Sequence, residues 1–474
     1  MGPDGQAESR HGWVWAALPA ECERAEVHGD AGLADLLREA GVDLDPGGRD
    51  PADAILLAEG RAPPPATLDA CSRRLPEGGV LVVALGGSAR HPDRWSRARR
   101  ALAPPLRAIA SGKAAARIRR RLRAAGLSVE QLDTGDRSRR HPLGVGGRLW
   151  RRGHVPQGAI LMAAAGARPR SVLERAIADV APALAAPIRV RGARVLASGI
   201  VLVQLDDGRP SMLRLAAGPA RALLAGAQGK LASLAAADPP APLRERVPWA
   251  VAGGDLGLAI YTLEPRLPGR HPRRLSPALW EESLDFLTAL RALPGAPRPA
   301  AGSLAGDVRA LAAHVDPRDR DTLARLEAAL DERLADVPLG WAHGDFWPRN
   351  LLARGDRLLG VLDWDAASPS ALPLLDLLHL IALADPQLKR LPHGERCRRG
   401  LWPLARAGGD ARLRSHCAAA GVPDDSVTLE ALAIAYWLTR VARDLRTFAD
   451  RPARGDWMKS NLRRPLAELA GWAR

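Results

Sequence analysis

Residues 341–350 read WAHGDFWPRN and set three hydrogen-bonding side chains among bulky apolar residues. His343 and Asp345 enclose a glycine, Asn350 follows five positions after Asp345, and Asp363 comes 13 positions after Asn350. A loop carboxylate can accept the proton of a hydroxyl and aim its oxygen at a phosphate. An amide and a second carboxylate can then share Mg²⁺ ions that bridge nucleotide phosphates. The spacing therefore predicts phosphoryl transfer.

The elements around these residues must bring them together. The turn signal ARGDR (353–357) is followed by the apolar run LLGVLDW (358–364), which predicts a hairpin with Asp363 at the end of a strand. Upstream, the apolar stretches 194–205 and 211–218 are joined by DDGRP, which also predicts a hairpin. Helices are expected over 219–237, 277–293 and 307–335.

The order HGDxxxxN, apolar strand, DWD resembles the aminoglycoside phosphotransferase and choline kinase family, whose members are relatives of the protein kinases. The resemblance spans about 190–450 and includes LEPRLPGR (263–270) and PLLDLLHL (373–380). It implies an α+β, protein-kinase-like bilobal fold over 188–474. The N-lobe would cover about 188–262 and the C-lobe about 266–474.

The resemblance also implies roles for single residues and a cofactor, ATP or GTP with Mg²⁺. Asp345 would be the catalytic base, Asn350 and Asp363 the metal ligands, and His343 a structural brace in the catalytic loop. Asp376 would anchor that loop through backbone hydrogen bonds. The residues expected to offer their backbone to the adenine are Thr262, Leu263 and Glu264.

Two departures from the family pattern concern the expected N-lobe. Arg214 replaces the lysine that pairs with nucleotide phosphates, and an arginine retains the charge with a bidentate geometry. Between Leu215 and Ala237 there is no acidic residue to hold it, and Gln228 is the polar substitute. The expected phosphate-covering turn, LASGIV, contains one glycine, Gly199. These features favour an active but divergent kinase, with a non-catalytic nucleotide-binding scaffold as the alternative.

Other polar residues have simpler interpretations beside functional ones. Asp365 could assist the metal site or be a solvated acid, and His314, His379 and His416 are expected to be ordinary helix residues. Because the family builds its acceptor pocket from C-lobe helices, acids there could bind a cationic amine or be surface charges. The acids in question are Glu281, Glu282 and Asp444.

Residues 1–170 alternate strand-like and helix-like segments, which predicts a Rossmann-like, three-layer α/β domain. Strands are expected over 14–19, 25–29, 52–60, 78–87, 127–133 and 158–166. The continuous apolar runs 52–60 and 78–87 are typical of strands buried on both faces. Residues 50–165 resemble the later half of a class I S-adenosylmethionine methyltransferase, but residues 1–50 lack its glycine-rich turn. A degenerate, substrate-presenting domain and a bifunctional methyltransferase–kinase are both open.

The net charge of +15 comes almost wholly from arginine, since only four of the 68 basic residues are lysines. No nucleic-acid motif accompanies it, so we expect no nucleic-acid partner. The densest basic run, Arg90 to Arg123, is typical of a solvated helical face or of a site for an anionic substrate.

The four cysteines are scattered, which suits a reducing compartment. The sequence shows no secretory signal and no apolar run of about 18 residues, so a cytoplasmic enzyme without a membrane span is expected. With the motifs above, this predicts an ATP-dependent kinase for a hydroxyl of a sugar, amino sugar or related metabolite.

Overall fold

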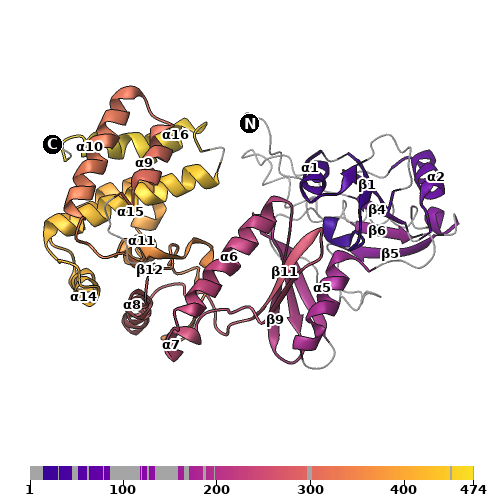
Figure 1. Cartoon of the computed structure of the whole chain (residues 1–474), viewed down its shortest axis with the longest axis horizontal. Helices are drawn as coiled ribbons and strands as arrows, with labels where there is room; N and C mark the ends of the chain where they lie inside the picture. Colours follow the sequence, from indigo (N-terminus) through magenta and orange to yellow (C-terminus); the bar gives the residue numbers. More distant parts are fainter. Residues whose placement is uncertain are drawn as a thin grey trace. The chain divides into compact units, whose positions relative to one another are not determined.

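A computed structural model describes most of the chain, which divides into two compact units. Unit 1 comprises Met1–Gly226 and Trp249–Arg266, and unit 2 comprises Ala227–Pro248 and Leu267–Arg474 (Figure 1). The domain bounds expected from the sequence, 1–170 and 188–474, remain a prediction. The described residues are 14–29, 31–44, 52–60, 63–77, 79–85, 118, 120–124, 127–133, 159–164, 170–184, 188–196, 198–295, 302–448 and 451–472.

The first sheet of unit 1 has the strand order β2-β1-β3-β4-β6-β5. Strands β2, β1, β3 and β4 are parallel, whereas β6 is antiparallel to both of its neighbours. Its strands are β1 (Arg24–His28), β2 (Asp43–Leu44), β3 (Ala54–Gly60), β4 (Val80–Leu85), β5 (Ser128–Asp133) and β6 (Ala159–Ala164). A parallel four-stranded sheet is thus present, as expected, while the full Rossmann-like assignment remains a prediction. The strand predicted over 14–19 is wrong, because Val14–Ala17 forms the 3-10 helix η1.

Strands β3 and β4 are buried on both faces, which confirms the prediction from their continuous apolar runs. Alternate side chains point to opposite faces. Leu56 and Val82 lie in one core cluster with Leu33 and Leu37 of α1 (Ala31–Glu39). On the other face, Ile55, Leu57, Leu81 and Val83 pack with Leu68 and Cys71 of α2 (Pro65–Arg74).

The predicted basic run, Arg90 to Arg123, lies almost entirely outside the described residues. Within it, Arg121 is paired with Asp69 of α2, at 2.8 Å from Nε to Oδ1. Both side chains are partly exposed, so this pair contributes little to stability.

The second sheet of unit 1 is antiparallel and has the order β10-β11-β9-β8-β7. The hairpin predicted at DDGRP is confirmed, since β8 pairs with β9 and their ends meet at Asp206 and Pro210. The elements are β7 (Arg189–Val195), β8 (Val201–Asp206), β9 (Pro210–Ala217), α6 (Pro219–Ala236), α7 (Ala241–Arg244), β10 (Ala252–Asp255) and β11 (Ala259–Pro265).

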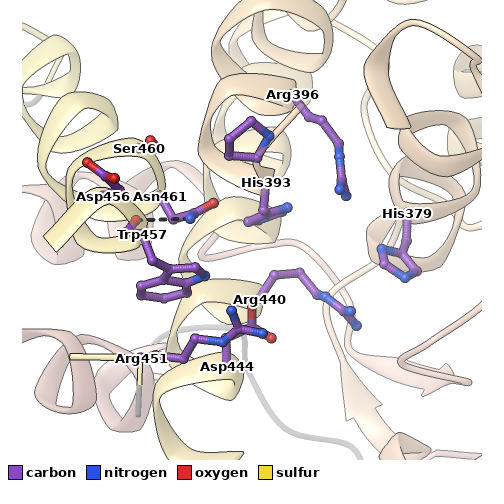
Figure 2. Close-up of a pocket in the computed structure, with 11 residues that line it drawn as sticks. His379, His393, Arg396, Arg440, Asp444, Arg451, Asp456, Trp457, Ser460 and Asn461 are labelled. Carbon is purple, nitrogen blue, oxygen red and sulfur yellow. Dashed lines mark hydrogen bonds between the residues drawn. The ribbon is translucent and has the colours of Figure 1, made fainter. Parts of the chain in front are cut away.

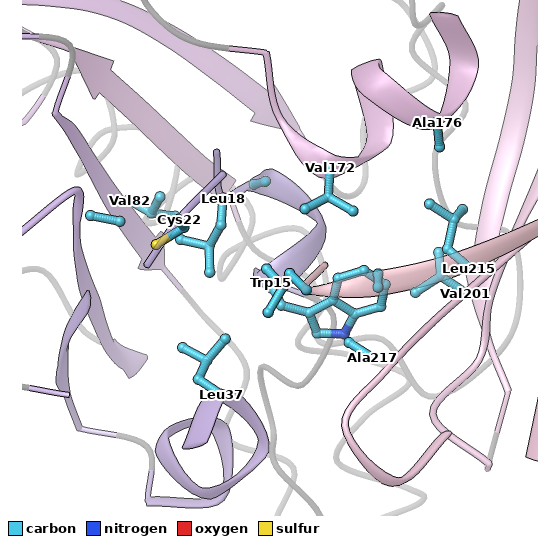
Figure 3. Close-up of a cluster of buried hydrophobic side chains, with 14 of the residues drawn as sticks. Trp15, Leu18, Cys22, Leu37, Val82, Val172, Ala176, Val201, Leu215 and Ala217 are labelled. Carbon is cyan, nitrogen blue, oxygen red and sulfur yellow. The ribbon is translucent and has the colours of Figure 1, made fainter. Parts of the chain in front are cut away.

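One hydrophobic core joins the two sheets of unit 1. Trp15 is fully buried among side chains from α5 (Val172–Val180) and from the second sheet, including Val172 and Leu215 (Figure 3). Helix α5 runs beside β11 and β9 (Figure 1) and is followed by η2 (Ala181–Ala183). The hydroxyl of Tyr261 on β11 donates to Asp179 of α5 at 3.4 Å.

Unit 2 is mainly helical, with short strand pairs β12–β15 and β13–β14. The second pair is the hairpin predicted at ARGDR. The single helical stretch expected over 307–335 is wrong: a helix ends at Ala312, and Asp316 caps a new one that begins at Pro317. The helices and strands are α8 (Pro277–Arg291), α9 (Ala305–Ala312), α10 (Pro317–Arg333), β12 (Gly340–Ala342), β13 (Leu351–Arg354), β14 (Arg357–Val361), η3 (Trp364–Ala366), β15 (Ser368–Ala371), α11 (Leu375–Ala384), η4 (Leu388–Arg390), α12 (His393–Arg396), the π-helix η5 (Cys397–Leu401), α13 (Trp402–Arg406), α14 (Ala411–Ala419), α15 (Ser426–Thr447), α16 (Gly455–Met458), the π-helix η6 (Lys459–Arg463) and α17 (Arg464–Leu469).

Helix α15 is the central element of unit 2 and is buried along most of its length. Asp425 caps it by accepting from the backbone N–H groups of Val427 and Thr428. The indole of Trp437 lies edge-on to Trp402, with ring centroids 6.0 Å apart, and donates to the backbone of Asn461 at 2.8 Å. In the described part of the chain, no helix combines the length and apolar character needed to cross a membrane. All four cysteines are buried free thiols.

Replacing Trp15 with Ala should destabilise unit 1 by about 3–5 kcal/mol, because it opens a large cavity in the core that joins both sheets. Unfolding by urea, followed by circular dichroism, measures the change. The control is Leu223→Ala on α6, since the Leu223 side chain is 52% exposed and should change stability by less than about 0.5 kcal/mol. Equal effects of the two substitutions would contradict the shared core.

Candidate active site

The loop between β12 and β13 carries the HGD motif and depends on its glycine. Gly344 has φ +77°, a left-handed conformation that favours glycine. A Cβ atom at this position would overlap the backbone carbonyl of Ala366. Only a residue without a side chain can bring the loop this close to η3.

Asp376, at the start of α11, anchors this loop, as predicted. Its carboxylate accepts the backbone N–H of His343 at 2.6 Å and that of Gly344 at 2.8 Å. Burial raises the pKa of Asp376 to about 6, although the two N–H groups act in the opposite direction. The backbone before it is strained, because Leu374 has φ +64°.

His343 links the loop to the following strand. Its Nε2 lies 3.0 Å from the carbonyl oxygen of Leu362, and its Nδ1 accepts the backbone N–H of Asp345 at 3.2 Å. These partners require a neutral ring with its proton on Nε2. Burial lowers the pKa of His343 to about 4, which is consistent with that form. The geometry suits the bracing role expected of this residue.

Asn350 connects Asp345 to the strand that leads to Asp363. Its Nδ2 donates to the backbone oxygen of Asp345 at 2.9 Å and to Oδ2 at 3.1 Å. Its backbone oxygen accepts from Leu362 at 2.8 Å. Because both amide hydrogens are directed at Asp345, Oδ1 is the end of the Asn350 side chain suited to a cation.

Asp363 follows β14 with φ +68° and ψ +64°, and its side chain is exposed. Few residues other than glycine adopt this conformation, although Asp tolerates it better than most. Asp363 and Asp345 both act on the guanidinium of Arg443. Burial lowers the pKa of Arg443, and these carboxylates act in the opposite direction. The structure thus brings Asp345, Asn350 and Asp363 into one neighbourhood.

The predicted secondary metal residue, Asp365, lies just beyond in η3. Its backbone oxygen accepts a hydrogen bond from Lys230. This contact concerns the backbone, so a metal-binding role for its carboxylate remains a prediction.

Two arginines that the sequence interpretation missed complete the surroundings of Asp345. Arg440 donates to Asp345 Oδ1 at 2.8 Å and to the backbone oxygen of Gly344 at 3.0 Å. Arg443 donates to the same backbone oxygen at 2.9 Å and lies 3.6 Å from Oδ1. Both come from α15, almost 100 residues further along the chain, so no local pattern near the HGD motif indicates them.

His379 is also part of the site, so the prediction of an ordinary helix residue is wrong. Its Nε2 lies 3.2 Å from Asp345 Oδ1, and its Nδ1 lies 2.8 Å from the hydroxyl of Tyr436. The contact at Nε2 lacks the geometry of a hydrogen bond, whereas Nδ1 and the Tyr436 hydroxyl are hydrogen-bonded. Burial lowers the pKa of His379 to about 3. The sequence signal for this role is that His379 lies one helical turn after Asp376 on α11, and so on the same side of that helix.

These neighbours decide the protonation state of Asp345. Burial raises the pKa of its carboxyl group, but the close contact with His379 and the charges of Arg440 and Arg443 outweigh burial. The pKa is therefore held well below its usual value, and Asp345 is ionised at neutral pH.

In unit 1, the residues predicted to contact the nucleotide lie on neighbouring strands of the second sheet. Arg214 on β9 faces Thr262 on β11, and its Nη1 lies 3.3 Å from Glu264 Oε1. An acid on the neighbouring strand, Glu264, therefore pairs with Arg214, and the role expected of Gln228 remains a prediction. Leu263 is buried between Thr262 and Glu264, while Gly199 lies exposed in the β7–β8 turn with φ +82°.

Residues 190–422 match the model of the phosphotransferase enzyme family, APH. The matched region spans just under half of the chain and is similar to that family, and the match supports small-molecule phosphotransferase activity. The match does not extend to residues 1–189, where the methyltransferase resemblance remains a prediction.

Solved structures of related enzymes are similar to part of the chain. A thermostable mutant of aminoglycoside phosphotransferase APH(4)-Ia, in complex with ADP and hygromycin B, shares 16% identity over 60% of this chain and 94% of its own (TM-score 0.42). Macrolide 2'-phosphotransferase MphH from Brachybacterium faecium shares 19% identity over 61% of this chain and 97% of its own (TM-score 0.42). Aminoglycoside 2'-phosphotransferase-IIIa, in its GDP complex, shares 15% identity over 60% of this chain and 94% of its own (TM-score 0.40). No curated protein matches the chain.

Gly344→Ala should lower the stability of unit 2 by about 1–3 kcal/mol more than Gly355→Ala does. Both glycines have positive φ, so both substitutions incur a left-handed backbone penalty of about 1–2 kcal/mol. Only the Cβ at position 344 meets the backbone, whereas the one at 355 meets open space. Thermal unfolding of the two variants measures the difference, and equal melting temperatures would argue against the close approach to η3.

Proposed function

We propose that this chain is an ATP- or GTP-dependent kinase that phosphorylates a hydroxyl group of a sugar, an amino sugar or a related small molecule. The observation that supports this most directly is the surroundings of Asp345. Arg440 and His379 contact its Oδ1 atom, and Asn350 donates a hydrogen bond to its Oδ2 atom. The carboxylate is thereby ionised and fixed in orientation, as a group that aligns an attacking hydroxyl must be.

The side chains available for Mg²⁺ fit that ion. Asn350 Oδ1 and the exposed carboxylate of Asp363 are hard oxygen donors, the type that Mg²⁺ prefers. Among the described residues, no group of three or more His, Cys, Asp or Glu side chains could hold a metal ion. Asn350 and Asp363 would therefore hold Mg²⁺ together with phosphate oxygens and water, and the bound ion would neutralise charge on the phosphates.

In the proposed reaction, Asp345 accepts a hydrogen bond from the acceptor hydroxyl and then its proton. The low pKa of Asp345 makes it a weak proton acceptor before the hydroxyl begins to react. Its main contribution is thus to orient the hydroxyl oxygen. Proton transfer to Asp345 follows as this oxygen bonds to the γ-phosphorus of the nucleotide, while the bond from that phosphorus to the β–γ bridging oxygen breaks and the nucleoside diphosphate leaves. Asn350 holds the carboxylate in place, and His343 and Asp376 hold the loop backbone.

Asp345→Asn should lower the rate of phosphoryl transfer by about 10²–10⁴-fold, because it removes the acceptor of the hydroxyl proton. Transfer is measured with γ-labelled ATP and GTP across a panel of sugars, amino sugars and amino alcohols. Asp424→Asn, at an exposed position of unit 2, is the control and should retain the wild-type rate. A wild-type chain that binds nucleotide but transfers nothing to any acceptor would favour the non-catalytic scaffold.

The proposal extends to the nucleotide-contacting residues of unit 1. Arg214 would contact the nucleotide phosphates while Glu264 holds its guanidinium. Thr262 and Leu263 would offer backbone groups to the base. Gly199 would allow a close approach of the β7–β8 turn to phosphate.

Arg214→Gln should weaken Mg·ATP binding by at least about tenfold, since a charge-assisted hydrogen bond to phosphate is worth about 1.5–3 kcal/mol. Titration calorimetry measures the affinity. Arg209→Gln, in the exposed β8–β9 turn, removes the same charge from the same sheet and should leave the affinity unchanged. Equal affinities of wild type and Arg214→Gln would exclude the phosphate-binding role.

A further inference from the structure

Unit 2 contains a cavity of about 490 Å³, lined by residues of α11, α12, α15 and the C-terminal helices (Figure 2). Two of its lining residues, His379 and Arg440, are the same residues that contact the Asp345 carboxylate. The cavity is therefore separated from the proposed base by one layer of side chains, and Asp345 itself is not among the lining residues. The other lining residues that matter here are Arg396, Asp444, Arg451 and Trp457.

We propose that this cavity binds the acceptor, and that the acceptor carries an anionic group, a carboxylate or a phosphate, held by Arg396. The inference rests on the proposed kinase function and narrows its substrate class. It differs from the sequence expectation of a cationic amine bound by acids of the C-lobe helices.

Arg396 has the features of an anion-binding residue. Its Nε donates to the backbone oxygen of Leu391 at 2.9 Å, which fixes the direction of the side chain. Figure 2 shows its guanidinium extending toward the side where His379 and Arg440 lie. Within the described residues, Arg396 forms no ion pair, whereas Arg398 and Arg399 on the next turn both pair with Glu395. Burial lowers the pKa of Arg396, and Asp444 acts in the opposite direction without forming an ion pair with it. A half-buried cation that is not directly paired is stabilised further when a ligand supplies an anion.

Arg451 adds a second cation on another side of the cavity. Its guanidinium stacks on Phe448 and Trp457, at 4.8 Å and 5.6 Å from the ring centroids. Its Nε is buried and has no hydrogen-bond partner. Such a group requires a ligand or water to satisfy it.

The acids of the cavity do not favour a cationic acceptor. Asp444 is half-buried, and burial raises its pKa while Arg440, Arg451 and Arg443 act in the opposite direction. An amine placed beside Asp444 would also approach these arginines. Asp456, the other lining acid, is exposed.

The remaining acids expected to bind an amine are otherwise occupied or do not line the cavity. Glu282 accepts from Arg246 at 3.2 Å, from Arg357 at 2.6 Å and from the backbone of Leu358 at 2.7 Å. Glu281 is exposed and is not among the lining residues. The lining thus contains three arginines against two acids, one of them exposed.

Other lining groups suit a hydroxylated carbon skeleton. His379 and His393 are neutral at pH 7, because burial lowers the pKa of each. They add no charge to the cavity, and both ring nitrogens of His379 already face Asp345 and Tyr436. Trp457 presents a flat apolar surface across the cavity from His379 (Figure 2). The arrangement fits an acidic sugar or a comparable hydroxy acid.

Calorimetric titration of the full chain with glucose, glucosamine, glucuronate and glucose 6-phosphate, with and without Mg·ADP, tests the inference. We expect one or both acids to bind at least about tenfold more tightly than glucose, and glucosamine to bind most weakly. Raising the ionic strength from about 0.05 to about 0.5 M should weaken binding of the acid but not of glucose. Comparing the affinity for glucuronate with that for glucose 6-phosphate shows whether the cavity prefers a carboxylate or a phosphate.

Arg396→Gln should weaken binding of the preferred acid by at least about tenfold and change glucose binding by less than about twofold. Arg396→Lys, which keeps the charge, should recover part of the affinity. Arg390→Gln removes an exposed charge six residues away, outside the cavity lining, and should behave as wild type. Circular dichroism confirms that the variants are folded.

The inference is overturned if no acid binds, if glucose or glucosamine binds as tightly as the acids, or if Arg396→Gln leaves acid binding unchanged. Its failure is distinct from failure of the kinase proposal. A chain that transfers phosphate to neutral sugars in an Asp345-dependent way, without preference for acids, refutes only the anionic acceptor. Arg396-dependent binding of an acid without any phosphoryl transfer refutes only the kinase function.

Discussion

The organisation of unit 2 depends on compensation of the mostly buried negative charge on Asp345. A carboxylate removed from water is costly unless hydrogen bonds and opposite charges replace its hydration. Here Arg440 and His379 contact one oxygen and Asn350 the other. Two of these groups come from helices distant in sequence, so the site forms only when α11 and α15 are packed. The same contacts that stabilise the carboxylate fix its orientation, which links the fold directly to the chemistry.

Backbone N–H and C=O groups of the HGD loop also have side-chain hydrogen-bond partners. Asp376 accepts hydrogen bonds from the N–H groups of His343 and Gly344, and the Gly344 carbonyl, which follows them in the chain, accepts from both Arg440 and Arg443. Such a loop has little freedom to change conformation, because each buried polar group that moved would lose its partner. The left-handed conformations of Gly344 and Asp363 are maintained by this network.

Features set by short-range pattern could be predicted from the sequence. The HGD loop, the two hairpins and the doubly buried strands β3 and β4 follow from spacing, turn residues and continuous apolar runs. Contacts set by long-range packing could not, and these include Arg440, Arg443 and the pairing of Arg214 with Glu264 across two strands. The helix boundary before Pro317 has a sequence signal, since Asp-Pro commonly begins a helix. Apolar periodicity on both sides of it nevertheless favours one continuous helix. Residues 14–17 are apolar like a strand, yet they pack as a 3-10 helix because Trp15 fills the core between two sheets.

That core also explains why residues 1–187 accompany a kinase-like region at all. Side chains alternate across the second sheet of unit 1, so Leu202, Ala216 and Ile260 face α6, where Leu224 covers them. The opposite face presents Val203, Leu213 and Leu263, and these are buried in the cluster that contains Trp15 and Val172. Without the preceding residues this apolar face would be open to water, and burial of such area is the main favourable term in folding. The described residues around Trp15 and Val172 therefore cover one face of the second sheet, whether or not the N-terminal region binds a ligand of its own.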